Sequence, residues 1–363
     1  MNPGRPNHEG DHDADVIPIN AGAHHGDGAS ARAHARGRDG PAGPGRSART
    51  SGSARSIASA PSSGTKGAPG PRASAAHDAG PEHDGRSSFE RDLAAGLRFL
   101  RRRLAGDYEV DEFGFDPDFA ETLLLPLARA LYRYWFRVEL EGLENVPEKG
   151  AALIVANHSG TLPVDAVMLQ TGIHDNTDRI LRLLGADLVY QVPFLGHLSR
   201  KGGHTLAHPA DTARLLAKGE LVGVFPEGFK GVGKPFRERY HLQRFGRGGF
   251  VASALRSQVP IIPCAIVGAE EIYPKIADLR PLARLLGFPY FPITPTWPWL
   301  GPLGLVPLPS KWIIQFGEPI PMSDYEPDAA DDAITVFDLT DHIRETIQHM
   351  LYDVLLRRGP AFF

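Results

Sequence analysis

Apolar side chains recur at spacings of three and four residues in three parts of the chain, a pattern typical of amphipathic helices. The first part covers residues 89–104, and arginines occupy its other faces. The second covers residues 118–136, where Pro126 is expected to kink the helix. The third covers residues 336–354 and is followed by two arginines, so we expect a long helix laid against the core.

Short β-type runs alternate with helical runs between the second and third of these helices. Strands are predicted at residues 151–155, 180–184, 221–225, 261–267 and 312–316, and helices at residues 163–170, 210–217 and 248–257. This alternation predicts an α/β fold, with a layered, mixed and largely parallel sheet flanked by helices. Much of that sheet should be buried on both faces.

Residues 1–88 depart from this pattern, because they contain no Leu, Phe, Tyr or Trp. Such a segment cannot bury enough apolar surface to fold. We therefore divide the chain into four parts. They are a disordered tail at 1–88, a basic amphipathic helical region at 89–137, an α/β core at 138–325 and a C-terminal amphipathic helix packed on that core at 326–363.

Charge and cysteine content exclude several classes of protein. The 363 residues include 39 Lys and Arg against 43 Asp and Glu, a formal net charge of -4, which argues against nucleic acid as a partner. The single cysteine, Cys264, excludes an intramolecular disulfide and a cysteine metal cluster, as suits a reducing compartment. The chain also lacks a secretory signal and an apolar run of the roughly 18 residues that cross a bilayer. We expect a cytoplasmic protein that holds no metal.

A histidine and an aspartate follow the strand at 151–155. His158 lies just beyond the strand, and Asp165 falls in the first turn of the next helix, close enough to fold back toward it. A carboxylate beside an imidazole is a general-base arrangement, because it holds one tautomer and stabilises the imidazolium. In the alternative interpretation, Asp165 only complements the helix dipole and His158 only binds backbone groups.

The strand at 221–225 also ends at an acidic residue, Glu227, and ligands of α/β sheets sit at this edge. Six cations follow it and only Glu238 opposes them. They are Lys230, Lys234, Arg237, Arg239, Arg244 and Arg247. This excess predicts a local phosphate-binding surface, and a merely solvated face is the alternative.

Three motifs in this order resemble the glycerolipid acyltransferase family, typified by lysophosphatidic acid acyltransferases. They are Asn157-His158 with Asp165, the Phe-Pro-Glu-Gly run at 225–228, and the Val-Pro-Ile-Ile-Pro run at 259–263. The resemblance covers residues 123–321. It implies that His158 deprotonates an acceptor hydroxyl, which attacks the thioester of acyl-CoA or an acyl carrier protein. The donor is a co-substrate, and no other cofactor is implied.

The same resemblance assigns the site residues. Asp165 orients His158, and Glu227 and Gly228 belong to the acceptor-binding site. Six residues separate His158 from Asp165 instead of the usual four, as in a divergent branch that reads His-Ser-Gly-x-x-Pro-x-Asp. The family's second motif normally supplies an arginine to the acceptor phosphate, but none stands after residues 193–196, so Arg200, Lys201 or His208 would replace it. Our substrate-binding candidates are Glu227, Gly228, Lys230, Arg200 and Arg247.

Residues 281–309 form an apolar, aromatic segment with eight prolines and one charged residue, Arg284. Prolines at this density are expected to prevent a helix. The segment either covers the core or sits at a bilayer interface, where Trp and Tyr are favoured. The basic helix at 89–104 likewise either adsorbs to an anionic membrane or packs on the domain with its charged face outward.

Together these features predict an O-acyltransferase of phospholipid biosynthesis, acting on a lysophospholipid or a related glycerolipid. The protein is expected to attach peripherally to the inner face of the cell membrane. A non-catalytic, membrane-associated lipid-binding protein with the same fold is the alternative.

Overall fold

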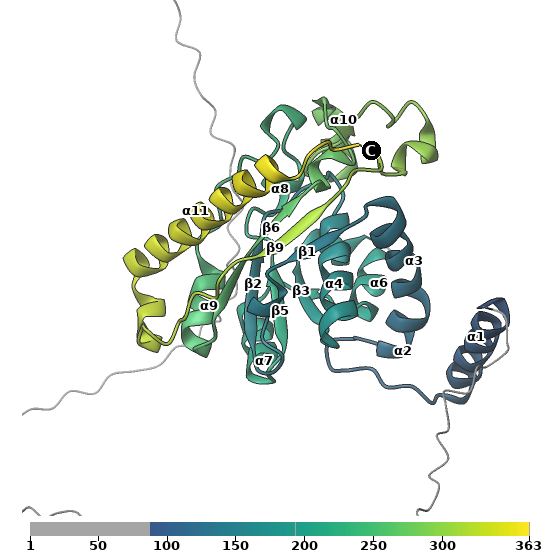
Figure 1. The fold of residues 1–363 in the computed structure, drawn as a ribbon, viewed down its shortest axis with the longest axis horizontal. Helices are drawn as coiled ribbons and strands as arrows, with labels where there is room; N and C mark the ends of the chain where they lie inside the picture. The colour runs from purple at the N-terminus through teal and green to yellow at the C-terminus, as the bar shows by residue number, and fades with distance from the viewer. Residues whose placement is uncertain (1–87, 193, 363) are drawn as a thin grey trace, which may run out of the picture. The chain divides into compact units, whose positions relative to one another are not determined.

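The structure, a computed structural model, describes residues 88–192 and 194–362 (Figure 1). The predicted tail at 1–88 therefore lies outside the described residues, apart from Ser88. A seven-stranded sheet organises the described part, and a two-stranded sheet, β7 (Ala277–Asp278) with β8 (Pro292–Ile293), accompanies it. In spatial order the seven strands are β1 (Glu139–Glu141), β9 (Ile313–Phe316), β6 (Ile261–Val267), β2 (Ala152–Ala156), β5 (Leu221–Val224), β3 (Leu181–Gly185) and β4 (Thr205–Leu206).

The sheet is mixed and largely parallel, as predicted. Neighbouring strands run parallel throughout, except that β6 and β9 are antiparallel. The central strand β2 pairs with β5 on one side and β6 on the other. All five of its residues are buried, because Ala, Leu, Ile and Val face helices on both sides.

Two helical layers cover the sheet (Figure 1). On one face, Leu153 and Val155 of β2 share a core with α7 (Pro209–Ala217), α9 (Gly249–Ser257) and α11 (Ala333–Arg357). On the other face, Ile154 shares a core with α4 (Val164–Thr177) and α3 (Leu125–Ala130). Alternate residues of β2 thus enter opposite cores, as the two-residue period of a strand requires.

The predicted C-terminal helix is confirmed as α11, the long helix drawn in yellow in Figure 1. Asp332 caps its start by accepting hydrogen bonds from the N–H groups of Ile334 at 3.1 Å and Thr335 at 3.2 Å. The remaining α-helices are short apart from the first: α1 (Ser88–Ala105), α2 (Pro117–Phe119), α5 (Asp187–Gln191), α6 (Leu195–Lys201), α8 (Phe229–Val232) and α10 (Arg280–Leu286).

The helical stretch predicted at 118–136 is interrupted twice by π-helical turns, at Ala120–Leu124 and Leu131–Trp135. Pro126 falls in the first turn of α3, directly after the first of them. The regular α-helical hydrogen bonding is therefore broken on both sides of the proline, which lacks an N–H donor.

The prediction that residues 281–309 contain no helix is wrong. Pro281 stands in the first turn of α10, where a missing N–H breaks no intrahelical hydrogen bond. A 3₁₀ helix follows at Gly301–Leu305, again with a proline in its first turn. Many apolar side chains of this segment are exposed, Trp299 and Leu303 among them, so they do not cover the core.

The basic face of α1 is divided. Arg103 binds Asp116 through both terminal guanidinium nitrogens at 2.6 Å, whereas Arg98 and Arg101 are exposed. Leu97, Leu100 and Leu104 are exposed as well. Within the described part of the chain, no helix has the length and apolar character needed to span a membrane.

Candidate active site

The end of β2 is locked to its neighbour by a buried amide. Asn157 accepts from the N–H of Ile266 at 2.7 Å and donates to the Ile266 carbonyl at 3.0 Å, so it completes the pairing between β2 and β6. The next residue, His158, consequently leaves the sheet at its carboxyl edge. Parallel α/β sheets bind ligands at this edge.

The structure brings His158 and Asp165 together. His158 Nδ1 lies 2.8 Å from Asp165 Oδ2 in a pair whose carboxylate is fully buried. The same carboxylate accepts from the backbone N–H of Ser159 at 2.8 Å and of Ala166 at 2.9 Å. Asp165 therefore does both things considered above, since its charge lies in the first turn of α4, where it complements the helix dipole, and it also holds the imidazole. The His158 ring stacks on Phe225, with 4.4 Å between ring centroids.

The two additional residues between histidine and aspartate are absorbed in a tight loop. Gly160 has a φ of +92°, and a Cβ atom there would lie 2.8 Å from the carbonyl oxygen of Ala269. Thr161 follows with a φ of +65° and is held on both sides. Its hydroxyl donates to the Tyr273 carbonyl at 3.2 Å, and its own carbonyl accepts from the Tyr290 hydroxyl at 2.6 Å. Pro163 occupies the N-cap position, so α4 begins at Val164, one residue later than predicted.

Glu227 reaches under the same loop from the end of β5. Its Oε1 accepts from the backbone N–H of His158 at 2.8 Å, and its Oε2 accepts from the N–H of Gln243 at 2.7 Å. The side chain is fully buried. The adjacent Gly231 has no room for a larger residue, because a Cβ there would lie 2.7 Å from Glu227 Cβ and 2.8 Å from the His158 carbonyl.

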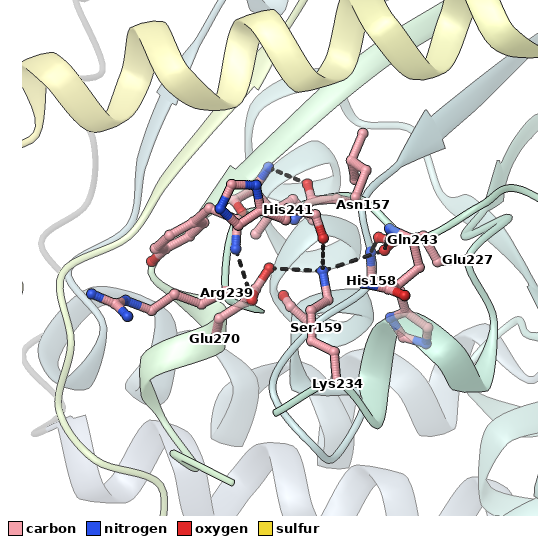
Figure 2. A network of polar contacts seen from close by, with 12 residues as sticks. Asn157, His158, Ser159, Glu227, Lys234, Arg239, His241, Gln243 and Glu270 are labelled. Carbon is pink, nitrogen blue, oxygen red and sulfur yellow. Dashed lines mark hydrogen bonds and ion pairs between the residues drawn. The ribbon is translucent and has the colours of Figure 1, made fainter. Parts of the chain in front are cut away.

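One of the six cations predicted to form a phosphate-binding surface is not on the surface. Lys234 is buried, 3.3 Å from Glu227 and 3.1 Å from Glu270, and it donates to the His241 carbonyl at 3.2 Å (Figure 2). Burial would lower the pKa of this ammonium, but the two carboxylates outweigh it and raise the pKa. Burial also raises the pKa of Glu270 to about 7, although Lys234 opposes that shift.

The other substrate-binding candidates differ in where they lie relative to His158 and Glu227. Gly228 follows Glu227 in the same loop, and Lys230 is exposed on α8. Gly246 donates to the carbonyl of Pro226 at 3.1 Å, so Arg247, which is exposed, lies beside that loop. Arg200 lies on α6 and stacks on Tyr190 at 4.7 Å. No hydrogen bond or ion pair joins Arg200 to His158 among the residues the structure describes.

The two other substitutes for the missing arginine have structural contacts of their own. Lys201 lies 3.8 Å from buried Asp116, and His208 caps α7 by accepting from the N–H of Ala210 at 3.2 Å. Burial raises the pKa of the Cys264 thiol, which lies in the middle of β6. In residues 88–192 and 194–362, no group of His, Cys, Asp and Glu side chains is arranged to hold a metal ion.

Comparison with known proteins identifies this arrangement. A family model described as Acyltransferase matches residues 137–267, which contain His158, Asp165 and Glu227. An uncharacterized protein of Mycobacterium tuberculosis is 58% identical over 273 residues, 75% of this chain and 76% of its own. The chain belongs to the glycerolipid acyltransferase family. It is an acyltransferase, whose substrates are an acyl donor and a lipid acceptor.

More distant relatives of this acyltransferase have names that refer to lipid synthesis. The chicken protein named DGAT1/2-independent enzyme synthesizing storage lipids is 27% identical over 232 residues, 64% of each chain. Mouse 1-acyl-sn-glycerol-3-phosphate acyltransferase alpha is 29% identical over 160 residues, 43% of this chain and 54% of its own. The crystal structure of a 1-acyl-sn-glycerophosphate acyltransferase from Thermotoga maritima aligns with a TM-score of 0.44 and 16% identity, covering 73% of this chain and 97% of that one.

The sequence did not reveal the residues whose hydrogen bonds and ion pairs hold the acyltransferase site in place. Asn157 was noticed only as part of a motif, and Lys234 only as a surface charge. Glu270 and Tyr290 were not noticed as site residues at all. The available signal was the charge of Glu270 three residues beyond a wholly apolar strand, since a buried carboxylate at such a place needs a cation.

Proposed function

We propose that the protein transfers a fatty acyl group from acyl-CoA or an acyl carrier protein to a hydroxyl of a lysophospholipid or a related glycerolipid. His158 acts as the general base. The observation that carries this proposal is the 2.8 Å contact between His158 Nδ1 and Asp165 Oδ2 at the carboxyl edge of the sheet. With Nδ1–H donated to the carboxylate, the lone pair of Nε2 faces outward to accept a proton.

The reaction needs two proton transfers, one from the acceptor hydroxyl to His158 and one from His158 to the leaving thiolate. Nε2 removes the proton of the acceptor hydroxyl while its oxygen attacks the thioester carbonyl carbon. The C–S bond then breaks, and the imidazolium returns the proton to the departing thiolate, so the products are an ester and a free thiol. A positioned base of this kind contributes about 10²- to 10⁴-fold to the rate.

Negative charge develops on the thioester oxygen and requires a donor. The N–H of Ser159 is already donated to Asp165 at 2.8 Å, and that of Gly228 to the Phe225 carbonyl at 3.0 Å. In the described chain the N–H of Gly160 has no such partner. We therefore assign it the oxyanion, and its left-handed backbone fits that role because it directs the N–H out of the regular ladder.

Lipid access is proposed to come from peripheral attachment to an anionic membrane at the inner face of the cell membrane. The exposed leucines of α1 and the exposed Trp299 and Leu303 support it, since soluble proteins rarely expose large apolar side chains in groups. The segment that contains Trp299 and Leu303 is anchored to residues 157–163, the loop that carries His158, which we call the catalytic loop. Tyr273 donates to the Leu305 carbonyl at 2.5 Å, and its own carbonyl accepts from Thr161 at 3.2 Å.

The test is CoA release from long-chain acyl-CoA in the presence of lysophospholipid vesicles. His158→Ala should abolish release that depends on the acceptor. Because the ring is only 13% exposed and is bonded to the buried Asp165, the melting temperature of the variant is measured to verify that it folds. His349→Ala, at an exposed position on α11, is the matched control and should be fully active. Acceptor-dependent release that persists in His158→Ala would contradict the proposal and leave the non-catalytic lipid-binding alternative or a different base.

A further inference from the structure

A hollow lies at the carboxyl edge of the sheet, at the end of α11. Its volume is about 470 Å³, within the range of small-molecule sites, and it is open to solvent. Arg237, Arg239, His241, Tyr352 and Arg358 line it. The last two come from α11 and the residue that ends it, so the hollow joins two segments more than a hundred residues apart in the sequence.

The hollow carries an excess of positive charge. Arg358 is neutralised by Glu271, with 2.5 Å between the charged groups, and Arg237 lies on the surface 3.3 Å from Glu238. Arg239 forms no ion pair with any residue in the described ranges. Its guanidinium stacks on Phe236 at 4.5 Å and donates only to the Phe236 carbonyl at 3.3 Å. A guanidinium held in place with most of its donors free is suited to a phosphate.

The backbone is strained at Tyr240, between two of the side chains that line the hollow. Tyr240 is buried with a φ of +63°, an uncommon conformation for a bulky residue, and its exposed neighbours are Arg239 and His241. Three contacts hold it there. Its N–H donates to Glu270 at 3.0 Å, its carbonyl accepts from Gln348 at 2.8 Å, and its hydroxyl donates to Glu271 at 2.8 Å. Strain that is fixed this firmly is typical of ligand sites.

Lys234 ties this hollow to the catalytic loop. It donates to the His241 carbonyl at 3.2 Å and lies 3.3 Å from Glu227, which holds the backbone of His158. Figure 2 shows the Arg239 side chain extending away from the His158 ring, on the other side of Lys234. The hollow is therefore a neighbour of the catalytic centre but separated from it by the buried network.

We propose that this hollow binds a phosphate-bearing group of one of the two substrates, and the inference rests on the proposed function. The separation favours the donor. In CoA the phosphates lie a long pantetheine arm away from the thioester, whereas in a lysophosphatidate the phosphate is only a few bonds from the hydroxyl that reacts. The rings of His241 and Tyr352, edge to face with 6.2 Å between their centroids, also offer an aromatic surface beside the cations for the adenine of CoA.

The test is equilibrium binding of free CoA and of glycerol 3-phosphate to the full chain by titration calorimetry. The variant is Arg237→Gln combined with Arg239→Gln, since both side chains are exposed and lie outside the buried network. Arg358 is left intact because it neutralises Glu271. The matched control is Arg256→Gln, an exposed arginine bound to Asp331 near the other end of α11. Melting temperatures verify that all variants fold.

The double variant should weaken CoA binding by about ten- to a hundred-fold and lower its salt dependence, because charge-assisted hydrogen bonds to phosphate are lost. The control should bind as the wild type does. Weakened binding of glycerol 3-phosphate with unchanged CoA binding would assign the hollow to the acceptor phosphate. Unchanged binding of both probes in the double variant, or no binding of either probe to the wild type, overturns the inference.

His158→Ala separates this inference from the proposed function. It should retain CoA affinity, since the hollow lies beyond Lys234 and does not include the ring. If the double variant loses CoA affinity while His158→Ala still releases CoA with an acceptor, the hollow stands and the general-base proposal falls. If His158→Ala is inactive and the double variant binds CoA normally, the proposed binding site in the hollow is wrong and the role of His158 as general base is supported.

Discussion

Glu227 accepts a hydrogen bond from the backbone N–H of His158, with 2.8 Å between Oε1 and the nitrogen. Its other oxygen is occupied by the N–H of Gln243 at 2.7 Å and by Lys234 at 3.3 Å. The protein itself therefore uses both oxygens of a side chain that the family resemblance assigns to acceptor binding. This arrangement favours a positioning role, in which Glu227 holds the backbone of the catalytic loop in place at His158.

Glu227→Gln tests that role. A glutamine has one acceptor oxygen in place of two, so either the N–H of His158 or that of Gln243 loses its partner, and Lys234 loses a neighbouring charge. A charge-assisted hydrogen bond contributes about 1.5–3 kcal/mol, so we expect kcat to fall by about ten- to a hundred-fold and KM for the acceptor to change little. Steady-state kinetics of CoA release measure both, with the exposed Glu345→Gln on α11 as the control. A raised KM with an unchanged kcat would show that Glu227 contacts the acceptor instead.

Asp165→Asn should separate the orientation of His158 from its presence. The asparagine amide presents an N–H where Asp165 Oδ2 now accepts from His158 Nδ1 and from Ser159, both at 2.8 Å. The imidazole is then driven to the wrong tautomer, and we expect kcat to fall by up to about 10⁴-fold, the loss seen when the buried aspartate of a catalytic triad is changed in this way. The measurement is kcat across pH 5–9. An activity within tenfold of the wild type would mean that the aspartate serves only to complement the dipole of α4.

The fold was largely predictable because its buried strands are almost purely apolar. Strand β6 was predicted over its full length, and the other long strands within one residue at each end. Strands β1 and β4 were missed for physical reasons. β1 carries glutamate at both ends of a three-residue edge strand, and β4 has only two residues, so neither displays a period. Their pairing depends on neighbours that are distant in the sequence.

The site divides in the same way. His158 and Glu227 each follow a strand end within three residues, and Asp165 lies in the first turn of the helix that follows β2, so the geometry of the sheet and its next helix gathers them. The ion pair of Lys234 with Glu270 spans 36 positions, and nothing local distinguishes Lys234 from the exposed Lys230. Sequence patterns report which face of an element is apolar. They do not report which of several cations will be desolvated by a carboxylate from another element.

Glu270 should give the protein a measurable pH dependence of stability. Burial raises its pKa to about 7 from 4.5, with Lys234 opposing the shift. The native state thus holds the proton more tightly than the unfolded chain does, so this contribution to stability is complete below about pH 4.5 and is lost as the pH rises through about 7. Glu270→Gln cannot titrate. Between pH 5 and pH 8 the melting temperature of the wild type should fall by about 5–10 °C relative to that of the variant.

Thermal unfolding at several pH values, with the exposed Glu318→Gln as the control, measures this difference. A constant offset between wild type and Glu270→Gln is compatible with the prediction, because the amide also loses one acceptor toward the N–H of Tyr240. Only the slope of melting temperature against pH, compared between the two proteins, tests the prediction. Parallel curves for the two proteins would mean that Lys234 keeps Glu270 ionised across the whole range.

Membrane attachment through the segment after β8 can be tested without disturbing the core. Trp299, Leu303 and Ile334 are each 71% exposed, but the first two belong to the apolar segment anchored to Tyr273, whereas Ile334 lies in the first turn of α11. Inserting a large apolar side chain into a bilayer gains about 1.5–3 kcal/mol. Trp299→Ser with Leu303→Ser should therefore weaken binding to vesicles of anionic phospholipid by at least about tenfold, as measured by co-sedimentation.

Ile334→Ser should leave vesicle binding unchanged, and all three substitutions should leave the melting temperature unchanged because the side chains are exposed. The double variant should also lose activity toward acceptors presented in vesicles while keeping activity toward a short-chain, water-soluble acceptor, since the catalytic loop itself is intact. Equal loss on both acceptors would place Trp299 and Leu303 in the acyl-binding path. An equal loss of vesicle binding in Ile334→Ser would mean that any exposed apolar residue contributes, and that this segment has no special part in attachment.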